Sequence, residues 1–279
     1  MTGRAASTSP TAVAIDDYLH TAIQAAREAG RIQLAELGSD LEVTTKSTDW
    51  DLVTRVDQLC EERIREVILS AHPSHEVLGE EGGSSLEGGD AGASHRWIVD
   101  PIDGTVNYAH GYPYFCVSIA LEMAGEVVLG VVLDPTRNEL FSAVKGAGAT
   151  LNGKELRVSR AASLAEAVVA TGFAYDAPTR LLNLELFGRV LPVVQGVRRA
   201  GAAALDVCYV ACGRLDAFWE LKLQPWDVAA ATLILREAGG TTSGQDGLPH
   251  RLTDPVLVAT NGALHVKLLD QLELGDLRV

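Results

Sequence analysis

The chain begins with two stretches in which apolar side chains recur at helical spacing. Over residues 16–37, Leu19, Ile23 and Ala26 lie three or four positions apart, and this period predicts an amphipathic helix. A second run over residues 54–71 repeats the pattern. The segment TTKSTDWD between the two runs has no such period, so it predicts a polar loop.

Strand-like runs follow in the middle of the chain. They cover residues 115–123, 126–135 and 139–145, and short turns separate them. Alternating runs joined by short turns predict an antiparallel meander. The Asn-Gly pair at 152–153 extends the meander by one more hairpin.

Two polar stretches lie between the second helix and the meander. HPSHE, at residues 72–76, carries a helix-breaking proline and predicts a surface turn. Residues 79–95 are rich in Gly, Ser and Asp and have no apolar period. We expect most of this second stretch to be an exposed loop.

Beyond residue 160 the pattern changes to strands that alternate with helices, which is typical of an α/β arrangement. The chain is therefore predicted to be α/β, with an α+β N-terminal half and an α/β C-terminal half. The predicted strands cover residues 167–173, 214–221 and 255–261, and the predicted helices cover residues 180–194, 202–213 and 226–240.

The predicted boundaries divide the chain into a flexible N-terminal tail (1–14), an N-terminal half (15–158) and a C-terminal half (159–279). No Pro/Gly-rich linker marks the boundary between the halves near residues 155–162. We therefore expect the two halves to pack tightly as one catalytic unit.

Composition narrows the class of protein. The 279 residues are 47% hydrophobic and carry a net charge of −14, which argues against direct binding of nucleic acid or of anionic membranes. No run approaches the length of a membrane span, and the first residues lack the pattern of a signal peptide. The four cysteines form no CxxC pair, so a reducing cytoplasm is the expected location.

The string WIVDPIDGT places two acids directly after an apolar run. Asp100, Asp103 and the carbonyl of Ile102 offer three hard oxygen ligands within four residues, a set that suits Mg²⁺ or Mn²⁺, and the lack of nearby His or Cys argues against zinc. Gly104 and Thr105 then open a segment whose free N–H groups can receive a phosphate. The alternative is an ordinary turn or helix cap.

Three further acids stand at the ends of predicted elements: Asp57 in VTRVD, Glu80 in GEE and Asp227 in PWDVAAA. Each has an ordinary explanation by itself, because helix starts favour acids and loop acids are solvated. Together with the DPIDGT acids they favour a metal centre, since buried carboxylates without a cation are strongly destabilising.

These four motifs, in this order and at these separations, resemble the inositol monophosphatase family of metal-dependent, lithium-sensitive phosphatases. The resemblance runs from about residue 16 to 275 and includes GVVLDPTRNELFSAVKGAGATLNG and GVRRAGAAALDVCYVACGRLDAFWE. It implies a layered αβαβα sandwich, a homodimer, and two or three Mg²⁺ ions, with Mn²⁺ as a substitute.

The resemblance also implies roles for individual residues. One ion would be held by Glu80, Asp100 and the Ile102 carbonyl, and a second by Asp100, Asp103 and Asp227. A third, weaker ion would sit near Glu80 through water. The implied catalytic residues, which orient and deprotonate the attacking water, are Glu80, Thr105 and Asp57. The implied substrate-binding residues are Asp103, Gly104, Thr105, Ala203, Glu220 and Asp227.

The implied activity is hydrolysis of a small phosphorylated polyol, myo-inositol monophosphate, by metal-activated water. The alternatives are a relative that cleaves histidinol phosphate, fructose 1,6-bisphosphate, a 3′-phosphoadenosine nucleotide or NADP, a non-catalytic regulatory partner, and a plain Mg²⁺-binding module. One position departs from the family, because Ala202 stands where Ser or Thr is usual. The sequence leaves the roles of Lys46 and of Arg198-Arg199 open.

Overall fold

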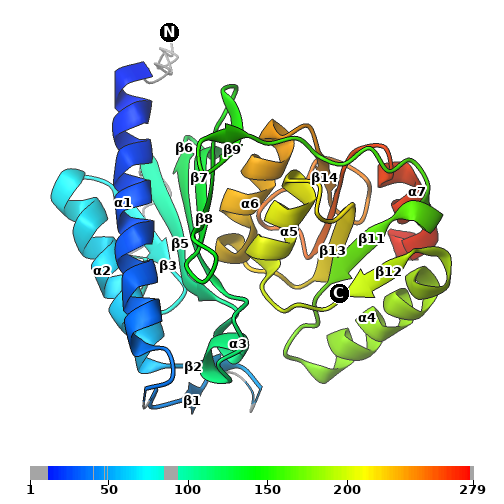
Figure 1. Cartoon of the computed structure of the whole chain (residues 1–279), viewed down its shortest axis with the longest axis horizontal. Coiled ribbons are helices and arrows are strands. Elements are labelled where there is room, and N and C mark those ends of the chain that lie inside the picture. The colour runs from blue at the N-terminus through cyan, green and yellow to red at the C-terminus, as the bar shows by residue number, and fades with distance from the viewer. Residues whose placement is uncertain (1–11, 40, 47, 49, 85–93, 277–279) are drawn as a thin grey trace, which may run out of the picture.

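The computed structural model describes residues 12–276 apart from 40, 47, 49 and 85–93. It has five layers, helix, sheet, helix, sheet and helix, which follow one another across the molecule in Figure 1. The predicted αβαβα sandwich is therefore confirmed. Within the described residues, no helix has the length and hydrophobicity needed to cross a bilayer.

Helices α1 (Ala12–Glu36) and α2 (Arg55–Ala71) form the first outer layer. Alanines on one face of α1, among them Ala22, Ala25 and Ala29, are fully buried. Small side chains at a helix–helix contact let the two backbones approach closely. The helix begins at Ala12, within the tail predicted over residues 1–14, and residues 1–11 of that tail lie outside the described residues.

An eight-stranded sheet forms the second layer, in the order β10-β9-β8-β7-β6-β5-β3-β4. The strands from β5 to β10 pair antiparallel in sequence, so the predicted meander is confirmed. Their bounds are β3 (Glu76–Gly79), β4 (Gly83–Ser84), β5 (His95–Asp103), β6 (Cys116–Met123), β7 (Glu126–Asp134), β8 (Glu139–Val144), β9 (Gly148–Leu151) and β10 (Lys154–Glu155).

The hairpin turns of this sheet use residues that tolerate a positive φ. Asn152 and Gly153 have φ values of 50° and 77°, as a type I′ turn requires, so the Asn-Gly hairpin is confirmed. The turn between β6 and β7 has the same character, with φ values of 51° at Ala124 and 81° at Gly125.

The loop that joins α1 to α2 contains Lys46 and lies at the lower edge of the molecule in Figure 1. Within it, β1 (Thr44–Thr45) and β2 (Leu52–Val53) form a small antiparallel hairpin in which Thr45 lies opposite Leu52. The segment predicted as a polar loop is therefore partly a hairpin.

The third layer contains α5 (Ala203–Ala211) and α6 (Pro225–Glu237), which pack between the two large sheets. Helix α6 lies directly on the backbone of β7. A Cβ atom at Gly130 would lie 2.6 Å from the carbonyl oxygen of Ala230, which is closer than such atoms can approach. Gly130 is therefore required for this packing.

A five-stranded sheet, in the order β12-β11-β13-β15-β14, forms the fourth layer, and two helices cover its outer face. It is mixed, because β11 pairs parallel with β12 and β13 while β15 pairs antiparallel with β13 and β14. The bounds are β11 (Val168–Thr171), β12 (Gly196–Arg198), β13 (Ala217–Leu221), β14 (Thr241–Ser243), β15 (Val256–Thr260), α4 (Ala177–Val190) and α7 (His265–Leu272).

Four elements of the C-terminal half differ from the sequence-based expectation. Strands β12 and β14 and helix α7 were not predicted. The helix predicted over 180–194 begins at Ala177 and continues after Val190 only as the 3₁₀ turn η2 (Leu191–Val193), which contains a proline. The two short 3₁₀ segments η1 (Leu164–Glu166) and η3 (Leu274–Asp276) complete the elements.

The two polar stretches before the meander have different outcomes. Much of the exposed loop expected over 79–95, namely residues 85–93, lies outside the described residues. The surface turn predicted at residues 72–76 is confirmed at Pro73 and Ser74, which are exposed, but the flanking His72 and His75 are only 8% and 9% exposed. Their rings stack with a centroid distance of 4.9 Å, and Trp97 donates its indole N–H to Nδ1 of His75 at 3.1 Å. Packing against β5 and α1 buries these two histidine side chains, and a local sequence pattern does not report such packing.

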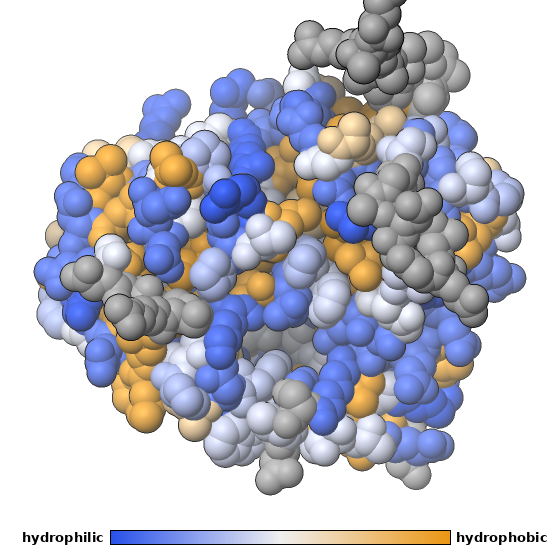
Figure 2. Space-filling model, turned by 180° about the vertical axis from the view of Figure 1, so that it is seen from behind, coloured by the Kyte–Doolittle hydropathy of each residue, from blue (hydrophilic) through white to orange (hydrophobic). Residues whose placement is uncertain are grey.

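Most of the molecular face seen from behind is hydrophilic, with hydrophobic residues in separate patches (Figure 2). The apolar side chains lie mainly in the three cores between the layers. The largest fully buried side chains include Trp97, Trp219, Tyr108 and Phe115. Rigid layers of this kind can hold acidic side chains at fixed positions where the elements end.

Candidate active site

A pocket of about 400 Å³ lies where segments of the two large sheets meet. Four of the acids predicted as functional line it, and the predicted pocket residues Gly104 and Ala203 line it with them. The lining acids from that prediction are Glu80, Asp103, Glu220 and Asp227. Asp57, Asp100 and Thr105 lie behind this wall, as their contacts below show.

Asp100 and Asp103 stand at the end of β5, where its pairing with β6 shifts register. Such a shift bends the strand and redirects its side chains. Asp100 is 2% exposed, and one of its oxygens accepts the backbone N–H of Ile102 at 2.9 Å. Burial raises the pKa of Asp100 well above its usual value, and the nearby Glu80 and Asp103 raise it further.

Asp103 is held by the first turn of α5. Its two carboxylate oxygens accept the backbone N–H groups of Ala203 and Ala204 at 3.1 and 2.7 Å. Burial raises the pKa of Asp103 to about 6, although these N–H groups oppose the shift. The N-cap residue of α5, Ala202, makes no side-chain capping bond, so a carboxylate from β5 takes over that function.

Glu80 directly follows β3, which lies parallel to β5, so both acidic segments leave the same edge of the sheet. Lys46 donates to Glu80 at 2.7 Å and to Glu81 at 2.5 Å. Burial lowers the pKa of Lys46, but the two carboxylates outweigh burial and the net shift is upward. The structure therefore places Lys46 in the site.

Asp227 occupies the first turn of α6, where it accepts the backbone N–H of Gln224 at 2.7 Å in a capping box. The expected helix-start position is thus confirmed. Burial raises the pKa of Asp227 well above its usual value, with further contributions from Glu80 and Asp103. A capping acid whose charge also faces two other acids is suited to a cation.

Asp57 and Thr105 form a buried pair. Asp57 is fully buried at position N3 of α2, and it accepts from the backbone N–H and the hydroxyl of Thr54 at 2.8 and 2.6 Å. Its other oxygen accepts the hydroxyl of Thr105, the first residue of α3 (Thr105–Ala109), at 3.1 Å. Burial raises the pKa of Asp57 to about 6, although the bonds from Thr54 oppose this.

Glu220 projects from β13 into the pocket from the opposite sheet. Burial raises its pKa well above the usual value, and the positive charge of Arg199 acts in the other direction. Arg199 lines the pocket, whereas Arg198 is not among its lining residues. The sequence did not single out Tyr175, which follows β11, or the loop after β13 that contains Lys222, and both contribute to the wall.

In the part of the chain that the structure describes, the candidate metal ligands are oxygen atoms, from the acids and from the Ile102 carbonyl, and such a set suits Mg²⁺ or Mn²⁺. Among the described residues, however, no group of three or more His, Cys, Asp or Glu side chains is arranged as it stands to hold an ion. Internal donors bind Glu80, Asp103 and Asp227, so a cation would compete with Lys46 for Glu80.

We expect the stabilisation by Mg²⁺ to increase with pH. The folded-state pKa values of Asp57 and Asp103 lie near 6, above the usual value of 3.8. Their contribution to stability is therefore present below about pH 4 and is lost as the pH rises through 6. Mg²⁺ held by the ionised carboxylate of Asp103 would offset the part of that loss that Asp103 contributes.

The measurement is the melting temperature with Mg²⁺ minus that with EDTA, at pH 5 and at pH 7.5. At pH 7.5 and saturating Mg²⁺ we expect a difference of roughly 5–10 °C. His75, whose pKa burial lowers to about 4, has the opposite pH dependence but affects both samples equally. A difference that stays constant or shrinks as the pH rises would contradict the prediction.

Comparisons with known proteins agree with one another. The family model described as "Inositol monophosphatase family" matches residues 14–275. The chain is 42% identical to an inositol-1-monophosphatase from Synechocystis over 255 residues, covering 91% of this chain and 88% of that protein. It is 43% identical to the Nus factor SuhB of Pseudomonas aeruginosa over 248 residues, covering 87% and 91%.

Solved structures show the same likeness. The extragenic suppressor protein SuhB from Bartonella henselae aligns with a TM-score of 0.87 at 40% identity, covering 92% of this chain and 99% of that one. The inositol monophosphatase from Anabaena aligns with a TM-score of 0.82 at 37% identity, covering 93% and 96%.

Proposed function

Because this chain belongs to the inositol monophosphatase family, we propose that it is a Mg²⁺-dependent phosphatase that hydrolyses myo-inositol monophosphate. The observation that carries the proposal is the group of buried acids from separate segments around one pocket. Glu80 raises the pKa values of both Asp100 and Asp227, and Asp227 also raises that of Asp100, as expected for charges that lie close together. Such a group is unfavourable without cations.

The proposed ligands are the side chains of Glu80, Asp100, Asp103 and Asp227 and the carbonyl of Ile102. Bound Mg²⁺ would supply a water of lowered pKa and charge neutralisation at the phosphate. The protein's contribution is to fix these oxygens: Asp103 through α5 and Asp227 through the start of α6.

Thr105 and Asp57 are the proposed proton acceptors for the attacking water. The Thr105 hydroxyl donates to Asp57 at 3.1 Å and also lies 3.0 Å from the Ile102 carbonyl oxygen. With a pKa of about 6, Asp57 is mostly ionised at pH 7.5 and can receive the hydroxyl's proton. The hydroxyl can then accept a proton from the water. Glu80 is proposed to contact the same water.

The remaining pocket residues are proposed to position the substrate. The N–H groups of Gly104 and Thr105 would bind the phosphate, and Glu220 would accept hydrogen bonds from ring hydroxyls. Ala203, which has a small side chain, lines the pocket beside them. The site offers room for a small phosphate ester, since the pocket measures about 400 Å³.

A second candidate function is that of a partner in a transcription complex. Relatives named Nus factor SuhB are as similar to this chain as those named inositol-1-monophosphatase. The net charge of −14 disfavours direct contact with RNA, so such a role would be exerted through protein contacts. Lithium inhibition and a homodimer remain predictions of the family resemblance.

The deciding experiment is a phosphate-release assay with Mg²⁺. Its panel contains inositol 1-phosphate, histidinol phosphate, fructose 1,6-bisphosphate, a 3′-phosphoadenosine nucleotide and NADP. We expect the highest kcat/KM with inositol 1-phosphate. A higher kcat/KM with another ester would support the proposed phosphatase activity but replace inositol 1-phosphate as the proposed substrate. A folded, Mg²⁺-saturated protein that released phosphate from none of them would refute catalysis and favour the partner function.

A further inference from the structure

Asn107, in α3, holds three backbone carbonyls with one side-chain amide. Its Nδ2 donates to the oxygen of Tyr114 at 2.7 Å, to that of Ala200 at 2.9 Å and to that of Gly201 at 3.3 Å. Tyr114 precedes β6 in the N-terminal half of the chain, whereas Ala200 and Gly201 lead into α5. One amide therefore joins the two segments.

The backbones pack closely at this junction. Gly104 and Gly201 have φ values of 95° and 91°, a region that favours glycine. A Cβ atom at Gly104 would lie 3.0 Å from the Tyr114 carbonyl oxygen and 3.3 Å from that of Gly201. Movement of the segment before α5 would therefore displace Gly104, which lines the pocket.

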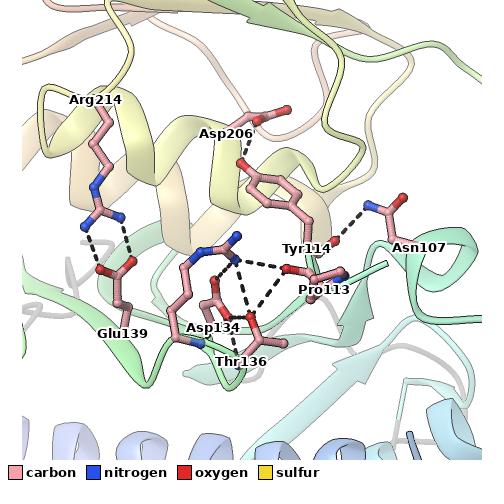
Figure 3. A network of polar contacts seen from close by, with 9 residues as sticks. Asn107, Pro113, Tyr114, Asp134, Thr136, Glu139, Asp206 and Arg214 are labelled. Carbon is pink, nitrogen blue, oxygen red and sulfur yellow. Dashed lines mark hydrogen bonds and ion pairs between the residues drawn. The ribbon is translucent and has the colours of Figure 1, made fainter. Parts of the chain in front are cut away.

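Tyr114 makes a second connection to α5. Its hydroxyl donates to Asp206 at 2.8 Å, and Figure 3 shows this bond together with that from Asn107 on the other side of the tyrosine. The first turn of α5 also provides the N–H groups that bind Asp103. Because Ala202 adds no side-chain cap, the placement of that turn depends on these contacts between segments.

We propose that Asn107 is a positioning residue for the phosphatase reaction. It fixes the position of the first turn of α5 relative to Asp103, and this orients the Asp103 carboxylate and places Ala203 at the pocket. Asn107 touches neither substrate nor metal in this role. The inference rests on the proposed function, since Asp103 is a proposed metal ligand. Residues that orient ligands in this way typically affect activity by about 10- to 100-fold.

The test compares Asn107→Ala with a matched control, Asn261→Ala. Asn107 is half-buried and Asn261 is buried, and the amide of Asn261 donates to the Ser159 hydroxyl and the Ala161 carbonyl at 3.0 and 2.9 Å. Asn261 follows β15 at the end of the sheet where Thr260 pairs with Ala217, away from Glu220. Both variants lose comparable amide bonds, so both are expected to melt earlier.

At a temperature where both are folded, only Asn107→Ala should lose kcat, by about 10- to 100-fold, with a much smaller change in KM. Amide hydrogen exchange at Ala203 and Ala204 should be faster in Asn107→Ala and unchanged in Asn261→Ala. An unaltered kcat, an equal loss in the control, or unaltered exchange would overturn the proposal. If Asn107→Ala does not fold, Asn107→Ser replaces it, with the same effects at smaller size.

The exchange measurement separates the two levels of inference. If the wild-type protein releases no phosphate from any ester, the proposed function fails, and exchange at Ala203 and Ala204 still decides whether Asn107 places the first turn of α5. If the wild type is active and exchange is unaltered, only the positioning role fails.

Discussion

Asp100→Asn is expected to reduce phosphate release by roughly 10³-fold or more and, in the same variant, to raise the melting temperature of the metal-free protein. The loss follows because a metal ligand contributes several kcal/mol of charge stabilisation in the transition state. The melting temperature rises because the substitution removes a buried charge that is repelled by Glu80, Asp103 and Asp227. An amide keeps the shape and can still accept the Ile102 N–H.

The measurements are initial rates with Mg²⁺ and calorimetry with EDTA. Each kcal/mol of repulsion removed should add roughly 2–4 °C. Asp216→Asn is the matched control: Asp216 is 9% exposed and accepts from Ser159 and Val168, outside the pocket lining. It should lose stability and keep its rate. Retention of a tenth of the wild-type rate, or a lower melting temperature without metal, would refute the prediction for Asp100→Asn.

Asp57→Asn is expected to lower kcat by about 10²- to 10⁴-fold, the usual contribution of a general base, with little change in KM. If the amide oxygen accepts from Thr54, its NH₂ group faces the Thr105 hydroxyl. That hydroxyl must then accept rather than donate, so its proton can no longer pass to residue 57. The capping box of α2 is also weakened, by about 1 kcal/mol.

Asp134→Asn is the control that separates the loss of a proton acceptor from the loss of stability. Asp134 is fully buried and accepts from the backbone N–H and the hydroxyl of Thr136 at 2.9 and 2.7 Å, as Asp57 does from Thr54. Figure 3 shows Asp134 beside Thr136 and Pro113. Arg137 donates to both Asp134 and Pro113, and none of these four residues lines the pocket. The control should be destabilised with kcat retained. Equal kcat values for the two variants would remove Asp57 from the proposed mechanism.

The long elements of the fold could be predicted because each has a strong local period. The 3.6-residue repeat indicated α1 and α2, and short turns between apolar runs indicated the meander. Strands β12 and β14 have only three residues each, too few to establish an alternation. The side chains of His72 and His75 are buried by packing against Trp97, a contact between distant segments.

The residues of the candidate site also differ in whether the local sequence indicates them. Asp100, Asp103 and Asp227 could be found because they stand next to apolar runs and within specific motifs. Lys46 and Arg199 come from polar segments, and only the folded chain shows that they lie at the pocket. The local sequence does not indicate the proposed role of Asn107, because that role depends on carbonyls of residues almost a hundred positions away.

The two sheets contribute different kinds of residue to the pocket. Asp103 ends β5 and Glu80 directly follows β3 in the eight-stranded sheet, whereas residues 172–176 and 222–224 are loops that follow strands of the five-stranded sheet. Loop sequences can vary without disturbing packed layers. Evolution or an engineer could therefore exchange the loops to accept a different ester while the hydrolytic chemistry is inherited intact.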